Sequence, residues 1–108
     1  METQCLKIKL KDGKKEQVRK WCATFANHPE LDEVLEQETV IVESLFLDEQ
    51  EDGDYLFFYL KAESLRKANE FLTTVKHPLN DLSQAFMHEC WDMDRVKKLE
   101  LTLDVHTL

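Results

Sequence analysis

The stretch TVIVESLFL-DEQEDGD-YLFFYLKA, residues 39–62, decides the fold. Two runs rich in β-branched and aromatic residues, 39–47 and 55–62, flank a polar segment that contains Asp52-Gly53. Runs of this composition are typical of strands, and an Asp-Gly pair between two strands is typical of a tight hairpin. The sequence therefore predicts an antiparallel hairpin with its loop at 48–54.

Both strands of this hairpin are apolar on both faces. Successive side chains of a strand point to opposite faces. In the first strand this places Val40, Val42 and Phe46 on one face and Ile41, Leu45 and Leu47 on the other. In the second strand it places Leu56, Phe58 and Leu60 on one face and Tyr55, Phe57 and Tyr59 on the other. Helices of one chain can cover only one face, and the other would be an unusually large apolar patch. Because burying each such side chain stabilises by roughly 1.5–3 kcal/mol, we expect a second copy of the sheet to cover it, in a two-fold homodimer.

The flanking segments complete an alternating pattern of strands and helices. A period-two strand at 5–10 precedes a turn at 11–13 and an amphipathic stripe of Val18, Trp21, Cys22 and Phe25, which predicts a helix. After the hairpin, Ser64 is placed to cap a helix, His77-Pro78 interrupts it, and a further helix is expected from Leu79 to Glu89. Alternating apolar residues predict a last strand at 96–105.

The resulting order, β-α-β-β-α-β, is that of a ferredoxin-like α+β domain, with an antiparallel sheet and helices on one face. The 108 residues are enough for a single domain spanning 1–108. The right-handed crossover rule places the first and third strands at the centre of the sheet, and the second and fourth at its edges.

Composition and charge limit the kinds of molecule that the protein is expected to bind. A net charge of −8 argues against binding to a phosphate backbone, and no apolar run reaches the roughly 20 residues of a membrane span. The N-terminal residues lack the pattern of a signal peptide, so we expect a cytoplasmic location. Three cysteines without a CxxC pair predict free thiols rather than disulfides or a zinc ribbon.

Known catalytic and metal-binding motifs are absent. His88-Glu89-Cys90-Trp91-Asp92 lacks the second histidine of a zinc helix, and the loop that starts at Asp48 has Tyr59 where a calcium loop needs glutamate. The chain has only two glycines, and neither lies in a phosphate-binding loop. We therefore expect no metal and no cofactor, and we expect any pocket to lie between the sheet and its helices or its partner.

Several segments resemble a family of small bacterial proteins of unknown function. They are the start METxCLKIKL, residues 38–47 and 54–62, the His77-Pro78 pair and Cys90-Trp91. The resemblance implies the dimeric α/β-barrel superfamily, in which ferredoxin-like subunits pair through their sheets. That superfamily includes antibiotic-biosynthesis-type monooxygenases, haem-using enzymes and sugar mutarotases. Members of the family often show a His-Pro-Ile-Asp-x-x-His run. This chain has Asn80 and Ser83 at the aspartate and second-histidine positions.

Three functions remain open from the sequence: a homodimer that binds a small ligand, an enzyme of monooxygenase or mutarotase type, and a non-catalytic interaction subunit. For catalysis the candidates are His77 and His88 for proton transfer and Glu43 as a carboxylate. For ligand binding they are Tyr55, Tyr59, Trp91 and Lys7.

Overall fold

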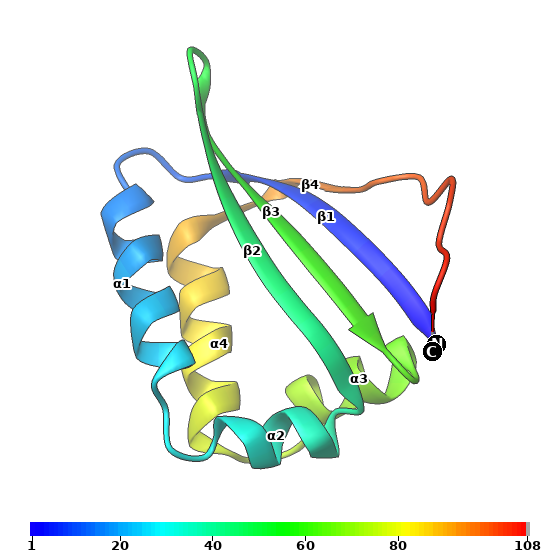
Figure 1. Cartoon of the computed structure of the whole chain (residues 1–108). Helices are drawn as coiled ribbons and strands as arrows, with labels where there is room; N and C mark the ends of the chain where they lie inside the picture. Colours follow the sequence, from blue (N-terminus) through cyan, green and yellow to red (C-terminus); the bar gives the residue numbers. More distant parts are fainter. Residues whose placement is uncertain (108) are drawn as a thin grey trace.

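The chain forms a four-stranded antiparallel sheet with four helices packed on one face (Figure 1). The computed structural model describes residues 1–107. The strands are β1 (Glu2–Leu10), β2 (Val40–Gln50), β3 (Gly53–Ala62) and β4 (Trp91–Lys98), and the helices are α1 (Lys15–Ala26), α2 (Leu31–Gln37), α3 (Leu65–Thr74) and α4 (Pro78–Cys90). The strand order β2-β3-β1-β4 confirms the ferredoxin-like prediction, with β1 and β3 central.

The hairpin is longer and its turn tighter than predicted. Strand pairing continues to Gln50 and Gly53, so only Glu51 and Asp52 remain in the turn instead of residues 48–54. Gly53 has a φ of 134°, a conformation that side chains disfavour, and a Cβ there would lie 3.1 Å from Cε of Lys9. The same lysine donates from Nζ to the carbonyl of Asp52 at 2.9 Å, which holds the turn against β1.

An irregularity in β2 corrects the predicted faces of that strand. Val40 pairs with Ala62 and Val42 pairs with Lys61, so one strand advances two residues while the other advances one. Such a bulge puts Val40 and Val42 on opposite faces, although simple alternation puts them together. Beyond the bulge the alternation is regular: Leu45 and Leu47 pack on the core, and Phe46 is 60% exposed on the other face.

The prediction of a last strand at 96–105 is wrong in position. β4 begins at Trp91, which pairs with Leu10, and it ends at Lys98. Leu101 and Leu103 lie outside any strand and are more than half exposed, so their regular spacing does not reflect a ladder.

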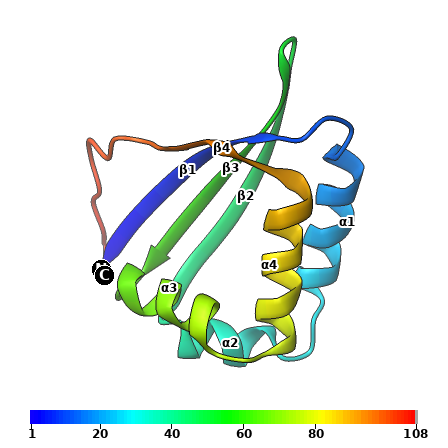
Figure 2. The same ribbon diagram turned by 180° about the vertical axis from the view of Figure 1, so that it is seen from behind.

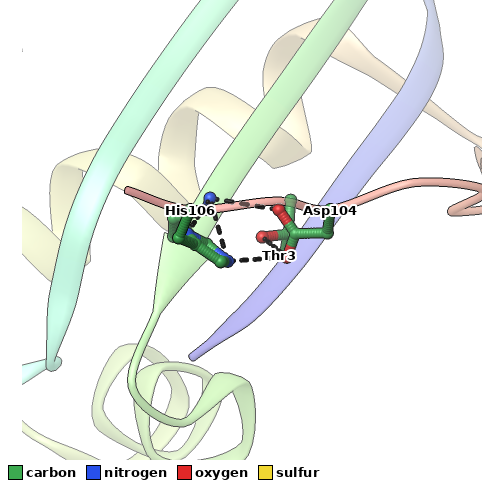
Figure 3. Close-up of polar contacts among 4 residues, drawn as sticks. Thr3, Asp104 and His106 are labelled. Atoms are coloured by element: carbon green, nitrogen blue, oxygen red, sulfur yellow. Dashed lines mark hydrogen bonds and ion pairs between the residues drawn. The ribbon is translucent and has the colours of Figure 1, made fainter. Parts of the chain in front are cut away.

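Beyond one backbone hydrogen bond, from the N–H of Leu99 to the carbonyl of Cys5 at 2.9 Å, side chains hold the segment after β4. It returns across the helix-free side of the sheet toward the N-terminus (Figures 1 and 2). There Asp104 accepts hydrogen bonds from Oγ1 of Thr3 at 2.8 Å and Nζ of Lys61 at 3.1 Å. The ring of His106 lies 3.2 Å from the same carboxylate (Figure 3). This cluster, Thr3–Lys61–Asp104–His106, fixes the C-terminal segment over β1 and β3.

One hydrophobic core joins the inner face of the sheet to α1 and α4. Its buried members are Ile8, Leu10, Val18, Trp21, Leu56, Phe86, Cys90 and Trp91. The Trp21 and Phe86 rings stack with centroids 4.1 Å apart, and Trp91 meets both Phe58 and Phe86 edge to face. Offset and edge-to-face contacts are the favoured aromatic geometries. The amphipathic stripe predicted from Val18 to Phe25 is thus the core face of α1.

The junctions on either side of α3 form as the sequence predicts. The Ser64 side chain accepts from the backbone N–H of Lys67 at 3.2 Å, which caps the start of α3. His77 caps α4: its Nδ1 accepts from the backbone N–H of Leu79 at 3.0 Å, and Pro78 occupies the first turn, where no amide hydrogen is needed.

Asn80 ties α4 to the end of α3, and its loss should destabilise the protein. Its side chain is 2% exposed and donates to the carbonyls of Phe71 at 3.0 Å and Val75 at 2.9 Å. We expect Asn80→Ala to lower the free energy of unfolding by about 1–3 kcal/mol, since the variant loses a buried side chain and both of its hydrogen bonds to the end of α3. Urea denaturation measures this, and a loss below about 0.5 kcal/mol would show that these bonds contribute little.

Candidate functional site

A cavity of about 230 Å³ lies between the inner face of the sheet and the helices. This is the location that the sequence predicts for a pocket. Strands β1, β2 and β3, all four helices and Trp91 contribute to its walls, which are mostly apolar. Its volume is below the usual range for small-molecule sites, roughly 300–1,000 Å³, so the cavity suits only a very small ligand.

Glu43 enters this cavity because of the register of the sheet. It pairs with Leu60, which in turn pairs with Gln4, and all three residues line the cavity. They form a row across β2, β3 and β1 on the face that the helices cover. Glu43 therefore occupies a position where the strand pattern otherwise places apolar residues such as Leu45.

Glu38 reaches the same cavity from the end of α2. It is the residue that ends this helix, and the next residue, Thr39, has a φ of 61°. A β-branched residue seldom adopts this conformation. The turn is held because Thr39 Oγ1 accepts from the backbone N–H of Ser64 at 3.2 Å and the Thr39 carbonyl accepts from that of Glu63 at 3.0 Å. This strained corner joins α2 to β2 and places the two glutamates together.

Both carboxyl groups resist ionisation. Burial raises the pKa of Glu43 to about 7 from an ordinary 4.5. Burial also raises the pKa of Glu38 to about 7, and the charge of Glu43 adds to that shift. No Lys, Arg or His side chain lines the cavity, and neither carboxyl group forms a hydrogen bond or ion pair with another described side chain. Near neutral pH each carboxyl group is therefore close to its protonation midpoint.

Aromatic side chains form much of the remaining wall. Trp21, Phe25, Phe58, Phe86 and Trp91 all line the cavity. Trp91 is 3% exposed, and its Nε1–H has no acceptor within the described part of the chain. A buried donor without a partner costs about 1–3 kcal/mol. The nitrogen itself is fully covered, so the indole hydrogen can contact a bound molecule if the Trp91 ring shifts toward the cavity.

Two of the seven predicted site residues, Glu43 and Trp91, line the cavity. The two histidines do not. His77 uses Nδ1 to cap α4, and its Nε2 lies 3.6 Å from Oε2 of Glu30. His88 is exposed near the end of α4, where its backbone carbonyl accepts from Nζ of Lys11.

The remaining three predicted residues lie together on the opposite, helix-free face. Nζ of Lys7 lies 4.7 Å from the centre of the Tyr55 ring, in a cation–π contact. Cys5, on the same side of β1 as Lys7, pairs with Tyr59. The sheet therefore separates Lys7, Tyr55 and Tyr59, which were predicted to bind a ligand, from Glu43.

Glu38 is the site residue that the sequence reasoning missed. It directly precedes the predicted strand at 39–47, and the sequence gives no sign that Thr39 turns back on itself. The signal that was available is Glu43, a carboxylate within a strand that is otherwise apolar. Gln4 and Ser83 also line the cavity, and neither was among the predicted site residues.

Within residues 1–107, no group of three or more His, Cys, Asp or Glu side chains is arranged to hold a metal ion. Cys5, Cys22 and Cys90 are all free thiols. None of the described helices is long and apolar enough to cross a membrane.

The fold and its cavity define the class: a ferredoxin-like domain with an acidic, aromatic-lined cavity between sheet and helices. The chain belongs to a family of unknown function (DUF6176), whose pattern matches residues 1–108. A comparison with curated proteins gives no match. Among solved structures, the chain is similar to the L-rhamnose mutarotase from Formosa agariphila, with a TM-score of 0.65 and 21% identity over 98% of this chain and 100% of the other. At this identity the likeness establishes the fold.

Proposed function

We propose that the protein is a small-ligand-binding domain and that the cavity is its binding site. The observation that carries the proposal is the half-buried carboxyl of Glu43, which lines the cavity on the core side of the sheet without a side-chain partner among the described residues. A buried polar group without a partner destabilises a fold. Its presence among apolar neighbours is accounted for if a bound molecule provides the missing contact.

A cavity-filling variant tests this proposal. Ser83 lines the cavity from α4 and is half-buried, so Ser83→Phe should occupy the space with little change elsewhere. Ligand-observed NMR with a library of monosaccharides, hydroxy acids and small amines should find binders of the natural protein that Ser83→Phe no longer binds. The exposed change Ala85→Phe on the same helix is the control. A library without any binder would favour the alternative of a non-catalytic interaction subunit.

A second candidate function is that of a sugar mutarotase. The similarity to a mutarotase fold prompts it, and the pair of carboxyl groups with pKa values of about 7 favours it. Conversion between sugar anomers needs a general acid and a general base together. Near neutral pH the pair can hold one proton, so that one carboxyl is protonated while the other is ionised.

The two carboxyl groups are sufficient to supply and accept every proton that the interconversion of anomers requires. The ionised carboxylate accepts the proton of the anomeric hydroxyl, the protonated carboxyl donates its proton to the ring oxygen, and the bond between the anomeric carbon and the ring oxygen breaks. The open-chain aldehyde rotates about its bond to the next carbon. The reverse transfers then close the ring on the other face and restore both carboxyl groups.

Anomeric exchange measures this activity directly. NMR saturation transfer between the α and β anomers of aldohexoses and deoxyhexoses should show acceleration by the natural protein and a loss of at least about 100-fold in Glu43→Gln, since one proton-transfer group is gone. Acceleration that persists in both Glu43→Gln and Glu38→Gln would remove the carboxyl pair from the mechanism.

We further propose that two chains pair through their helix-free sheet faces. Phe46 and Phe57 are cross-strand partners on this face, and Phe46 and Val42 are 60% and 40% exposed in the single chain. A second copy would bury these side chains with a gain of roughly 1.5–3 kcal/mol each.

Phe46→Lys should therefore convert the dimer to a monomer. It puts two like charges into the apolar centre of the proposed contact without disturbing the core. Sedimentation at micromolar concentration should give twice 12.8 kDa for the natural protein and 12.8 kDa for the variant. Met93→Lys, an exposed apolar residue of β4, is the comparison. A natural protein that already sediments as a monomer would refute the pairing.

A further inference from the structure

The charges around the cavity are unbalanced. Its only ionisable lining residues are Glu38 and Glu43, and it has no cationic side chain among the described residues. Cys22 of α1 is the other titratable neighbour, because burial and then the charge of Glu43 raise the pKa of its thiol. When both glutamates ionise, no side chain of residues 1–107 that lines the cavity neutralises them. Buried charges in proteins are normally paired.

The aromatic walls suit a positive charge as well. Trp21 stacks between Phe25 and Phe86, with centroids 4.7 and 4.1 Å away, and Phe58 and Trp91 form an edge-to-face pair. Because Phe25 and Phe86 cover both faces of Trp21, an ammonium group can meet only the remaining ring faces, which attract it by up to about 2 kcal/mol when water is excluded. Carboxylates beside aromatic faces therefore favour a cation over an anion at this site.

The indole hydrogen of Trp91 gives a second, independent requirement. It is a buried donor without an acceptor, and neither a cation nor a hydrocarbon can satisfy it. A ligand that contacts it must carry an oxygen or another acceptor in addition to the charge.

We propose that the cavity binds a small organic cation, a protonated amine with a neighbouring hydroxyl or carbonyl oxygen, whose ammonium group pairs with Glu38 and Glu43 and whose oxygen accepts from Trp91 Nε1. This inference rests on the proposed ligand-binding function and names the class of ligand. It sets the site apart from one made for a neutral sugar, for which the carboxyl pair would act in proton transfer.

A matched pair of probes distinguishes a site for a cation from a site for a neutral sugar. trans-2-Aminocyclohexanol and trans-1,2-cyclohexanediol have nearly the same shape, and only the first is cationic. Calorimetry at about pH 8 should give an affinity at least about tenfold higher for the amine, the least that a charge-assisted contact to a buried carboxylate provides. Between about pH 8 and about pH 6 the affinity for the amine should fall about tenfold, because the carboxyl groups take up protons there. The diol should show no such fall.

Variants complete the test. Glu43→Gln keeps the shape of the side chain and should lower the affinity for the amine about tenfold or more, while Glu36→Gln, exposed on α2, should leave it unchanged. Equal or tighter binding of the diol, or unchanged amine binding in Glu43→Gln, would overturn the cation proposal and leave the ligand-binding function standing. If neither probe binds and the library described above also has no binder, both proposals fail.

Discussion

Glu43→Gln should make the protein more stable at alkaline pH and remove much of the pH dependence of its stability. The pKa of Glu43 is about 7 in the folded chain, against an ordinary 4.5. Between these values the folded state holds a proton that the unfolded state releases, so the free energy of unfolding falls as pH rises through this window. The contribution of Glu43 to the free energy of unfolding is therefore fully present below about pH 4.5 and is lost as the pH rises through about 7.

The variant cannot ionise, so it avoids this loss. At about pH 8 we expect Glu43→Gln to exceed the natural protein in free energy of unfolding by about 2 kcal/mol, which is below the full value of the shift because the side chain is only partly buried. At about pH 5 the two should differ little. The pKa of Glu38 should also fall in this variant, since the charge of Glu43 contributes to its shift.

Urea denaturation at the two pH values measures the effect, with Glu36→Gln as the control for loss of an exposed carboxylate. A variant that is less stable than the natural protein at both pH values would mean that the Glu43 carboxylate has a favourable partner in solution.

Phe86→Ala should cause the largest loss of stability. Phe86 is 4% exposed, stacks on Trp21 and meets Trp91 edge to face, so its ring joins α1, α4 and β4. Removing it loses both contacts and leaves a void beside the existing cavity. We expect a cost of about 3–5 kcal/mol, typical of a buried phenylalanine replaced by alanine.

Thermal or urea denaturation checks this, and Met93→Ala, at a side chain that is 59% exposed, should change stability by less than about 0.5 kcal/mol. A cost near that of the control would show that the helices can close over the lost ring, and the cavity would then have no fixed wall.

The sequence predicted the fold well because the deciding signals are local. Alternation in β1, the amphipathic stripe of α1, Ser64 and His77-Pro78 each act within a few residues, and their order leaves few ways to arrange the sheet. The failures have local causes too. The spacing of Leu99, Leu101 and Leu103 resembles a strand, but β4 already pairs with β1 from Trp91 onward. The bulge near Ile41 reverses the faces on either side of it.

The sequence predicted only some of the residues of the candidate site. Glu43 and Trp91 stand out by chemical type, as a carboxylate in an apolar strand and a tryptophan beside a helix end. The face that each residue occupies depends on the register and on the bulge, so the sequence did not show that Glu43 and Trp91 share a cavity while Tyr55, Tyr59 and Lys7 lie across the sheet. Glu38 enters the cavity only through the unusual backbone of Thr39, and no local pattern indicates a positive φ at a threonine.

The most direct test of the account is a carbon NMR titration of the Glu43 side-chain carboxyl, assigned by comparison with Glu43→Gln. We expect this carboxyl to titrate at about pH 7 in the protein without ligand. A midpoint near the ordinary 4.5 would show that water or a cation already satisfies the group, and would contradict a half-buried carboxyl that lacks a partner until a ligand binds.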